Sequence, residues 1–509
     1  MINDRLPAAA VELEQRSHRE ALRSSAIIGG SQVVSIAMGL VRTKLAAVIL
    51  GPAGIGAIGL LQTLLQTASN LASGGIGTSG TRQIAESKTD EARQWAVRRA
   101  LRLVTLVCGL LGAAITFSLS SPIARLALGD ERQSSIVAWL SIGVFLTVIT
   151  FGQNSVLIGL RRIGDSARMN IVSSLGAAII GVTAILVWHQ DGVIAFVLAT
   201  PAAMALIGLL FIRRLPRAPA NGAPASRILP EAVRLLKLGA AFAVAGTVSA
   251  FSQLAFRSIL GQSASVAALG QFQAAWFISM TYVGFVLQAM GADYYPRLTS
   301  AIAKREPPAR LVQEQIEVAL ALAGPVLLGT IAVAPIVIWL LYSAEFAPAA
   351  WILRWQILAD VLKVASFPLG YLLLAQGRAW TFMALELTNN IVMLAALAVL
   401  LPLVGIEASG IAVLVSYVTY LVSVAVAVWR PSGLGMRAMV IRQFAALLAA
   451  AIATFIAAFL SFWAGLVVGL ALAGIFAILA VRRLDHALPT AARRLSRRLF
   501  LIRNEDFDA

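Results

Sequence analysis

The sequence has few of the residues from which soluble enzymes build catalytic and metal sites. Charged residues make up 13% of its 509 residues, and it contains one cysteine, Cys108, and three histidines. A single cysteine excludes both a disulfide framework and a C-x-x-C metal site. The histidines lie outside or at the ends of the apolar runs. No G-x-x-x-x-G-K-[ST] occurs, which excludes a P-loop for ATP.

Apolar residues are present in great excess. They make up 59% of the chain, and the mean hydropathy is +0.84. Soluble domains contain about 45–50% apolar and about 25% charged residues. The composition therefore predicts an all-α polytopic membrane protein.

The apolar runs predict the individual spans, because a bilayer core needs about 20 apolar residues per helix. Fourteen spans are expected, at residues 25–49, 55–80, 100–120, 135–158, 170–188, 193–212, 239–260, 269–290, 316–341, 352–375, 380–401, 409–429, 444–461 and 464–481. The last pair, 444–481, has one long helix as its alternative, so twelve spans plus a C-terminal extension stays open.

Basic residues are distributed very unevenly between the two sides of these spans. With the N-terminus inside, 34 of the 41 lysines and arginines fall in cytoplasmic segments and only Arg125 and Arg132 in external loops. This bias follows the positive-inside rule and places both termini in the cytoplasm. It also explains the net charge of +17 without nucleic acid, since basic loops lie against an anionic leaflet. The polar N-terminus lacks the layout of a cleaved signal peptide.

A basic, proline- and alanine-rich segment divides the spans into two groups of six. The predicted parts are a tail (1–24), a first lobe (25–212), a linker (213–238), a second lobe (239–430), the final pair (444–481) and a basic cytoplasmic tail (482–509). A loose internal repeat supports this division, since RTKLAAVILGPAGIGAIGLLQ from Arg42 resembles RSILGQSASVAALGQFQ from Arg257. Two related six-helix lobes around a central cavity are a common transporter plan.

Polar residues within the spans form stripes at helical spacing. The stripes are Gln32, Ser35, Gly39 and Arg42; Gln62, Gln66, Asn70 and Ser73; and Gly246, Ser249, Gln253 and Arg257, with Gln273 completing the repeat. One such stripe is explained equally well by an interhelical hydrogen bond. Three stripes in matched positions favour a hydrophilic cavity, because polar groups in spans usually face one.

Other ionisable residues within the spans have two interpretations each. Lys44 lies near the external end of its span, where it snorkels to the interface or contributes to substrate binding, and Arg354, near the external end of another span, binds a headgroup or a ligand. Asp360 and Lys363 share a helix face and are expected to form a structural pair, with ion coupling as the alternative. Glu386 lies on one face with two amides and serves either ion coupling or structure; these amides are Asn389 and Asn390.

The stretch LGPAGIGAIGL contains Gly54, Gly56 and Gly59 in the G-x-G-x-x-G spacing of a dinucleotide-binding turn. The context excludes that function. The preceding apolar run is too long for a strand, and no acidic residue lies between Glu20 and Glu86 to bind a ribose. These glycines are instead expected to let two helices approach closely, after Gly51-Pro52 breaks the first span.

The segment GLVRTKLAAVILGPAGIGAIGLLQ resembles the first hairpin of Wzx-type polysaccharide repeat-unit flippases. These proteins belong to the MATE/MurJ-like (MOP) superfamily. The resemblance implies an undecaprenyl-pyrophosphate-linked oligosaccharide as substrate, moved from the cytoplasmic to the periplasmic leaflet of the inner membrane. Arg42 matches an arginine that is important in the related lipid II flippases. In those proteins the two extra spans form a groove for the lipid tail.

This resemblance and the polar stripes together give the expected mechanism. Arg42 and Arg257 are expected to bind the pyrophosphate, with bidentate guanidinium contacts, while the stripe amides line the sugar path. The protein is expected to act as a monomer. Its expected partners are membrane lipids and the polysaccharide polymerase and chain-length machinery. No cofactor is expected beyond H⁺ or Na⁺ coupling.

Two rival functions stay open. A MATE-like drug or cation antiporter would depend on acidic cavity residues. A membrane polymerase or ligase would need a catalytic group and commonly a large external loop, whereas the longest external loop here, 121–134, is short.

Overall fold

The computed structural model describes residues 8–216, 225–432 and 437–487, with only the backbone given for residues 8–28. Most of the predicted basic tail, from residue 488 on, lies outside these residues. The described part of the chain is helical and contains no strand, which confirms the all-α class. Its helices of more than twenty residues are α1 (Ala8–Ser73), α3 (Glu91–Ser118), α5 (Ser134–Gly159), α6 (Ile163–Trp188), α7 (Val193–Arg213), α8 (Ala225–Ser263), α9 (Val266–Ala303), α10 (Ala309–Leu341), α11 (Ala349–Ala375), α12 (Ala379–Val404), α13 (Ala408–Ser432), α14 (Ala438–Leu460) and α15 (Phe462–Ala487).

Most of these helices have the length and composition of membrane spans. Within the described residues, nine segments are long and apolar enough to cross a bilayer, and three of them, Gly29–Ser73, Ile163–Arg213 and Ala379–Trp429, each contain two predicted spans. Large apolar side chains are exposed along their outer faces, for example Val48 at 60% and Phe117 at 62%. Exposed apolar surface on helices of this length is typical of contact with lipid. The chain is a multi-pass membrane protein, and its number of spans stays a prediction.

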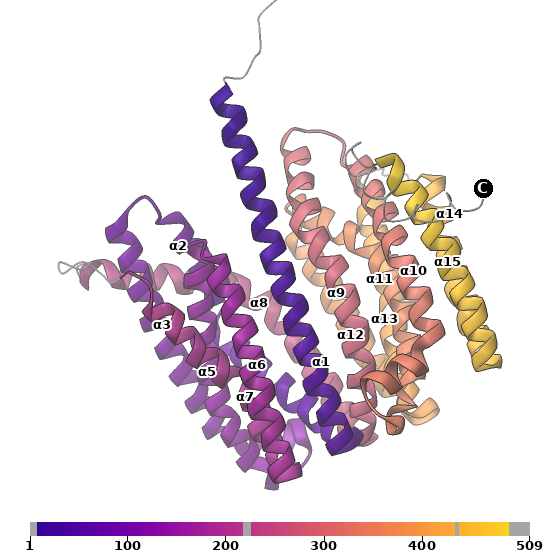
Figure 1. Cartoon of the computed structure of the whole chain (residues 1–509), viewed down its shortest axis with the longest axis horizontal. Coiled ribbons are helices and arrows are strands. Elements are labelled where there is room, and N and C mark those ends of the chain that lie inside the picture. The colour runs from indigo at the N-terminus through magenta and orange to yellow at the C-terminus, as the bar shows by residue number, and fades with distance from the viewer. Residues whose placement is uncertain (1–7, 217–224, 433–436, 488–509) are drawn as a thin grey trace, which may run out of the picture. The chain divides into compact units, whose positions relative to one another are not determined.

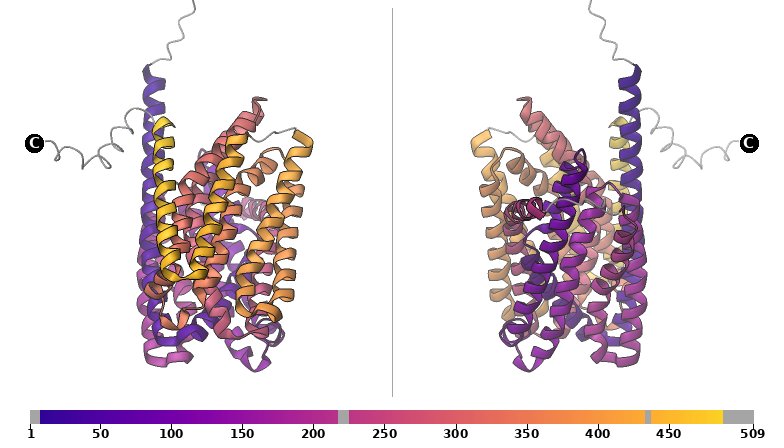
Figure 2. Two further views of the ribbon diagram at one scale, coloured as in Figure 1. Left: turned by 90° about the vertical axis from the view of Figure 1, so that its right-hand side faces the viewer. Right: turned by 90° about the vertical axis from the view of Figure 1, so that its left-hand side faces the viewer.

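The chain forms two compact units. The first comprises Met1–Gln273 with Leu341–Glu345, and the second comprises Ala274–Leu340 with Phe346–Ala509. Helix α9 passes from one unit into the other at Gln273. In the first unit α3, α5, α7 and α6 pack in series (Figure 1). In the second unit α13 packs on α11 and α12, and α14 lies beside α15 (Figure 2).

Helix α1 is two helices that meet at Gly51. This residue has φ 63° and ψ −167°, a left-handed conformation that glycine adopts without a steric penalty. The proline that follows, Pro52, has the fixed φ that suits the start of a helix. The break predicted at Gly51-Pro52 is therefore confirmed.

The glycines after this break pack mainly against the start of α9, rather than against the first span as predicted. A Cβ atom on Gly56 would overlap the carbonyl oxygen of Val266, and one on Gly59 would lie 2.8 Å from Cγ of Gln273. Gly54 alone lies against the first half of α1, at Leu50. The G-x-G-x-x-G spacing thus serves helix contact, and it brings the two halves of the internal repeat together.

The end of the predicted linker, residues 229–238, is part of α8, which continues as one helix into the span that follows. Its inner face packs on α2 (Ile76–Glu86) and α3 through Ala232 and Leu235, which are buried. Residues 217–224 of the linker lie outside the described residues.

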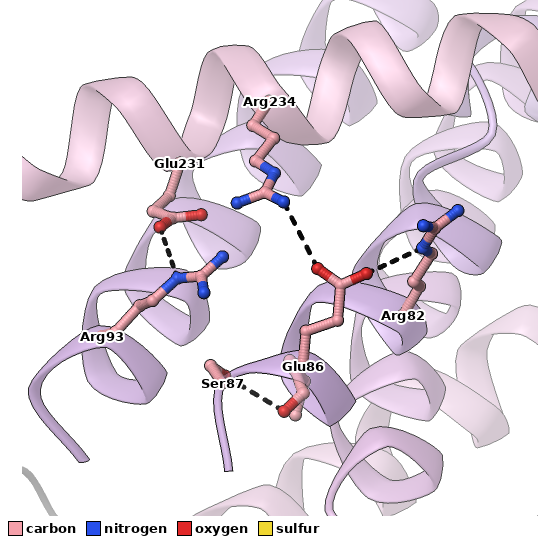
Figure 3. A network of polar contacts seen from close by, with 7 residues as sticks. Arg82, Glu86, Ser87, Arg93, Glu231 and Arg234 are labelled. Atoms are coloured by element: carbon pink, nitrogen blue, oxygen red, sulfur yellow. Dashed lines mark hydrogen bonds and ion pairs between the residues drawn. The ribbon is translucent and has the colours of Figure 1, made fainter. Parts of the chain in front are cut away.

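Ion pairs connect the start of α8 to α2 and α3 (Figure 3). Arg93 Nε lies 2.9 Å from Glu231 Oε1. The Glu86 carboxylate accepts from Arg82 Nε at 2.8 Å and lies 3.4 Å from Arg234 Nη2. The hydrogen bond and charge of Arg82, with the charges of Arg234 and Arg93, hold the pKa of Glu86 below its ordinary value.

Candidate functional site

A polar cavity of about 690 Å³ lies within the first unit. Amide and hydroxyl groups from α1, α5, α7, α8 and the first turns of α9 line it. These polar residues are Gln62, Thr63, Gln66, Thr67, Asn70, Thr147, Thr150, Asn154, Thr200, Ser249, Gln253 and Gln273. Among the described lining residues there is no carboxylate and no cation.

The second half of α1 contributes the predicted stripe to this cavity. Gln62, Gln66 and Asn70 all line it, and Gln66 Nε2 donates to Asn70 Oδ1 at 2.8 Å. Ser73, the last member of the predicted stripe, is buried and donates to the carbonyl oxygen of Asn70 instead. The four-residue spacing therefore predicted that these three side chains share one helix face, and that face lines the cavity.

Arg257 lies directly behind the lining. Its side chain is 4% exposed. Nε donates to Gln273 Oε1 and Nη1 to Gln253 Oε1, both at 3.2 Å. The structure thus brings together three residues that the sequence placed in one site, although Arg257 itself does not line the cavity.

This contact fixes which end of each glutamine faces Arg257. A guanidinium group has donors only, so both glutamines direct their carbonyl oxygens toward it. Their Nε2 amino groups are then left for other partners. Because Gln253 and Gln273 line the cavity, their amides lie between it and the charge of Arg257.

Arg42 lies in the gap between α1, α6 and α7, again one side chain behind the cavity lining. Nη1 donates to Thr200 Oγ1 at 2.5 Å, and Nη2 donates to the carbonyl oxygen of Phe196. The guanidinium carbon lies 3.9 Å from the centre of the Phe196 ring, a cation–π contact. Nε has no hydrogen-bond partner among the described residues. Through Thr200, Arg42 is connected to the same cavity as Arg257.

The other two predicted polar residues of the first span, Gln32 and Ser35, line a separate cavity of about 220 Å³. Polar residues of α6 also line this cavity; they are Asn170, Ser173 and Ser174. The two cavities have Thr200 and Met204 in common. The first stripe thus faces polar groups, as predicted, but Gln32 and Ser35 line a different cavity from Gln62 and Gln66.

The sequence analysis missed the lining residues of α5 and α7. Asn154, Thr147 and Thr150 lie on α5, and Thr200 precedes Pro201 on α7. A polar residue beside a proline in an otherwise apolar span is a usable signal, because proline removes a helical hydrogen bond that neighbouring groups then replace. The Gln153-Asn154 pair is a second signal, since both amides fall inside one predicted span.

Lys44 and Arg354 each donate a hydrogen bond to a backbone carbonyl oxygen. Contact of either residue with a headgroup or a ligand stays a prediction. Lys44 is half-buried, and its Nζ donates to the carbonyl oxygen of Tyr342. Arg354 is 3% exposed; its Nε donates to the carbonyl oxygen of Ile331 at 3.2 Å, and it lies over the Trp351 ring. Backbone carbonyl contacts of this kind favour a structural role over ligand binding.

The predicted ion pair between Asp360 and Lys363 is wrong, because none is present between these two side chains among the described residues. Asp360 accepts a hydrogen bond from Ser279 at 2.6 Å. Lys363 Nζ lies 5.1 Å from the centre of the Tyr417 ring and 3.5 Å from Met280 Sδ. The two residues share a helix face, as predicted, but their charged groups contact residues of neighbouring helices instead of each other.

Glu386, Asn389 and Asn390 lie on α12 in the second unit. Both asparagines are buried, and Asn390 Nδ2 donates to the carbonyl oxygen of Glu386. Asn389 Oδ1 has no hydrogen-bond partner among the described atoms. The predicted role of these residues in ion coupling stays a prediction. Within the part of the chain that is described, no group of three His, Cys, Asp or Glu side chains is placed to hold a metal ion.

Comparison with known proteins identifies the family. A family model described as polysaccharide biosynthesis protein matches residues 45–351, which include the residues that line the cavity and Arg257 but not Arg42. The chain belongs to this family. The polysaccharide biosynthesis family is the one that the sequence resemblance implied.

Individual relatives agree with this assignment. The chain is 24% identical over 421 residues to the lipid III flippase of Escherichia coli (strain K12), covering 78% of this chain and 95% of that protein. The protein of the same name from Shigella flexneri matches equally.

Solved structures show the fold. The lipid II flippase MurJ in an inward closed conformation has a TM-score of 0.69 at 12% identity, over 90% of this chain and 99% of its own. An inward-facing MATE family transporter of the MOP superfamily has a TM-score of 0.67 at 16% identity, over 81% and 95%. This polysaccharide biosynthesis protein therefore has the MOP-superfamily fold.

Proposed function

We propose that this protein is a flippase that moves an undecaprenyl-pyrophosphate-linked oligosaccharide from the cytoplasmic to the periplasmic leaflet of the inner membrane. One observation carries the proposal. Arg42 and Arg257, 215 positions apart in the sequence, each donate hydrogen bonds to side chains that line one polar cavity. The names of the relatives, which are flippases of lipid-linked precursors, point in the same direction.

The lining suits a sugar. Oligosaccharide hydroxyls must exchange hydrogen bonds with water for equivalent ones during transfer, since an unmade buried hydrogen bond costs about 1–3 kcal/mol. Amides and hydroxyls supply both donors and acceptors, and they do so at the lining of this cavity without any carboxylate among the described residues. Such a surface tolerates variation in the sugar.

The positions of the arginines suit the pyrophosphate. An anion entering the cavity meets the Nε2 donors of Gln253 and Gln273, with the charge of Arg257 immediately behind them. The substrate's phosphate oxygens bind these amides first, and the arginine acts through them. Arg42 acts in the same way through Thr200. Direct bidentate contact, as expected from the sequence, would require each arginine to leave its present partners.

A second candidate is a cation or drug antiporter of the MATE type. The observation in its favour is the presence of two carboxylates in the second unit, the buried Asp360 on α11 and the half-buried Glu386 on α12. In that case acidic residues, rather than the polar cavity of the first unit, would bind the transported cation. Substitution of Asp360 by Asn separates the candidates, since it abolishes antiport but leaves binding to the amide-lined cavity intact.

Deletion of the gene tests the flippase proposal in cells. Loss of the protein is expected to cause lipid-linked repeat units to accumulate on the cytoplasmic face, where an added glycosidase reaches them only after the membrane is opened. Accumulation on the periplasmic face, or unchanged surface polysaccharide, would contradict the proposal. We further propose cytoplasmic termini, H⁺ or Na⁺ coupling and action as a monomer alongside a polysaccharide polymerase and chain-length machinery.

A further inference from the structure

An apolar groove of about 850 Å³ lies on the other side of the helix pair that bounds the polar cavity. Its walls come from α1, α3, α8 and the short turns α4 (Ser120–Ile123) and η1 (Ala124–Leu128). Several wall residues are largely exposed, including Leu111 at 57% and Ile115 at 58%. The groove therefore opens sideways from the unit, where exposed apolar side chains face lipid.

The α1–α8 pair is a partition with two different faces. On α1, Gln66 and Asn70 face the cavity, whereas Leu64 and Leu71 face the groove. On α8, Gln253 faces the cavity and Leu254 the groove. The polar and the apolar spaces are therefore adjacent along the same stretch of both helices.

Thr67 lines both spaces. It is buried, and its hydroxyl lies 3.3 Å from the carbonyl oxygen of Ala250 on α8. The cavity and the groove therefore meet at Thr67, so a molecule with one part in each space would pass this residue.

The groove has a defined floor and one closed end. A Cβ atom on Gly112 of α3 would overlap that of Ala72 on α1, so these helices meet at the floor. At the other end Gln262 Nε2 donates to the carbonyl oxygen of Leu126 at 2.8 Å, which connects the end of α8 to η1. Branched side chains of Leu and Ile form the walls between these points.

We propose that this groove binds the isoprenoid chain of the lipid-linked substrate while its polar head occupies the cavity; this rests on the proposed function. An amphiphile with a large polar head and a long branched tail needs two such spaces within the length of its covalent linkage. The tail gains little from leaving lipid, which is as apolar as leucine. Binding therefore depends on packing, and the branched walls match a branched chain.

A membrane phospholipid is a poorer occupant. None of the groove's described lining residues is a lysine or arginine, so a phosphate headgroup has no cationic partner there. The substrate places its phosphates on the other side of the partition, beside the amides held by Arg257. The site also differs from the C-terminal pair of helices, where the sequence resemblance placed a tail groove.

Two neighbouring leucines allow a matched test. Leu111 lines the groove, whereas Leu110 is equally exposed, at 59%, but does not line it. Leu111→Trp fills the groove, and Leu110→Trp adds the same bulk outside it. Purified full-length protein in liposomes is given one fluorescent pyrophosphate-linked oligosaccharide carried on either an undecaprenyl or a farnesyl chain.

The wild type and Leu110→Trp are expected to move the undecaprenyl form about tenfold faster, a binding difference of about 1.4 kcal/mol. Leu111→Trp is expected to lose this preference and to keep the farnesyl rate. Retention of the preference by Leu111→Trp would overturn the proposal, because a structural defect alone would slow both substrates.

A binding measurement separates this proposal from the proposed function. A diazirine-bearing undecaprenyl phosphate is expected to label the α3 peptide that contains Leu111, and excess undecaprenyl phosphate, but not phosphatidylglycerol, should prevent labelling. Equal protection by phosphatidylglycerol would overturn the groove's assignment. If the wild type moves neither substrate, the flippase proposal fails, and the labelling result still decides whether the groove binds an isoprenoid.

Discussion

Arg257 Nε on α8 donates to Gln273 Oε1 on α9 across 3.2 Å. Since guanidinium has only donors, this contact decides the orientation of the Gln273 amide and leaves its Nε2 group for the cavity. Arg257 thus determines the chemistry of a wall that it does not itself form. The same relationship holds for Arg42 and Thr200, whose hydroxyl accepts from Nη1.

Gln273→Glu tests this orientation directly. The change keeps the size of the side chain but replaces the amino group by an oxygen, and the new carboxylate pairs with Arg257. We expect transport to fall about 10–100-fold, because a hydrogen bond to a charged group contributes about 1.5–3 kcal/mol. Gln190→Glu, at an exposed position on η3 (His189–Gly192), is the control and should transport normally. Equal rates for both variants would mean that the Gln273 amide does not contact the substrate.

Thr200→Val removes the hydroxyl that accepts from Arg42 and keeps the shape of the residue. We expect a loss of transport of about tenfold, with a change in stability of about 1 kcal/mol, the net value of one hydrogen bond. Thr299→Val, at a position near the end of α9 and outside the cavity, is the matched control. Transport by Thr200→Val at the wild-type rate would show that Arg42 does not act through Thr200.

Gly56→Ala tests the close contact between α1 and α9. The added Cβ overlaps the Val266 carbonyl oxygen, which belongs to backbone and cannot rotate away. We expect a loss of stability of about 1–3 kcal/mol, typical of overpacking, measured by thermal unfolding in detergent. Gly39→Ala is the control, since nothing lies within 4 Å of a Cβ there, and alanine in a helix is favoured over glycine by about 0.5–1 kcal/mol. A stable Gly56→Ala variant would contradict the packing role of this glycine.

Glu86→Gln tests the ion pairs between α2 and α8 through their pH dependence. Arg82 and Arg234 hold the pKa of Glu86 below its ordinary value, so its contribution is present at neutral pH and is lost as the pH falls through the lowered pKa. Hydrogen exchange of α2 and α8 amides should be faster in the variant at neutral pH, and the free energy of local opening should fall by less than about 1 kcal/mol. The difference should vanish in acid. A difference that persists unchanged in acid would show that the carboxylate charge is not its cause.

The sequence predicted the helices and the polar faces because both depend on local periodicity. The spacing of Gln62, Gln66 and Asn70 places them on one face whatever packs against it. It also predicted the break at Gly51-Pro52, since glycine and proline act through their own backbone.

The partners across helices were not predictable from one sequence. Asp360 and Lys363 share a helix face, yet Asp360 accepts a hydrogen bond from Ser279 and Lys363 lies over the Tyr417 ring. Likewise, no periodicity indicates that Lys44 reaches the carbonyl of Tyr342, or that Gln32 and Gln62 line different cavities. These outcomes depend on which helices become neighbours, and that is set by packing over the whole unit.

The proposed function requires that the amide-lined cavity, with its two arginines, translocates a lipid-linked oligosaccharide. This is measured as the initial rate at which a fluorescent undecaprenyl-pyrophosphate-linked oligosaccharide changes leaflet in proteoliposomes. We expect rapid transfer by the wild type and by Arg125→Ala, whose side chain is exposed, and a loss of at least about tenfold, or about 1.4 kcal/mol, in Arg257→Lys and Arg42→Lys. Transfer no faster than in protein-free liposomes, or equal rates in all four proteins, would contradict it.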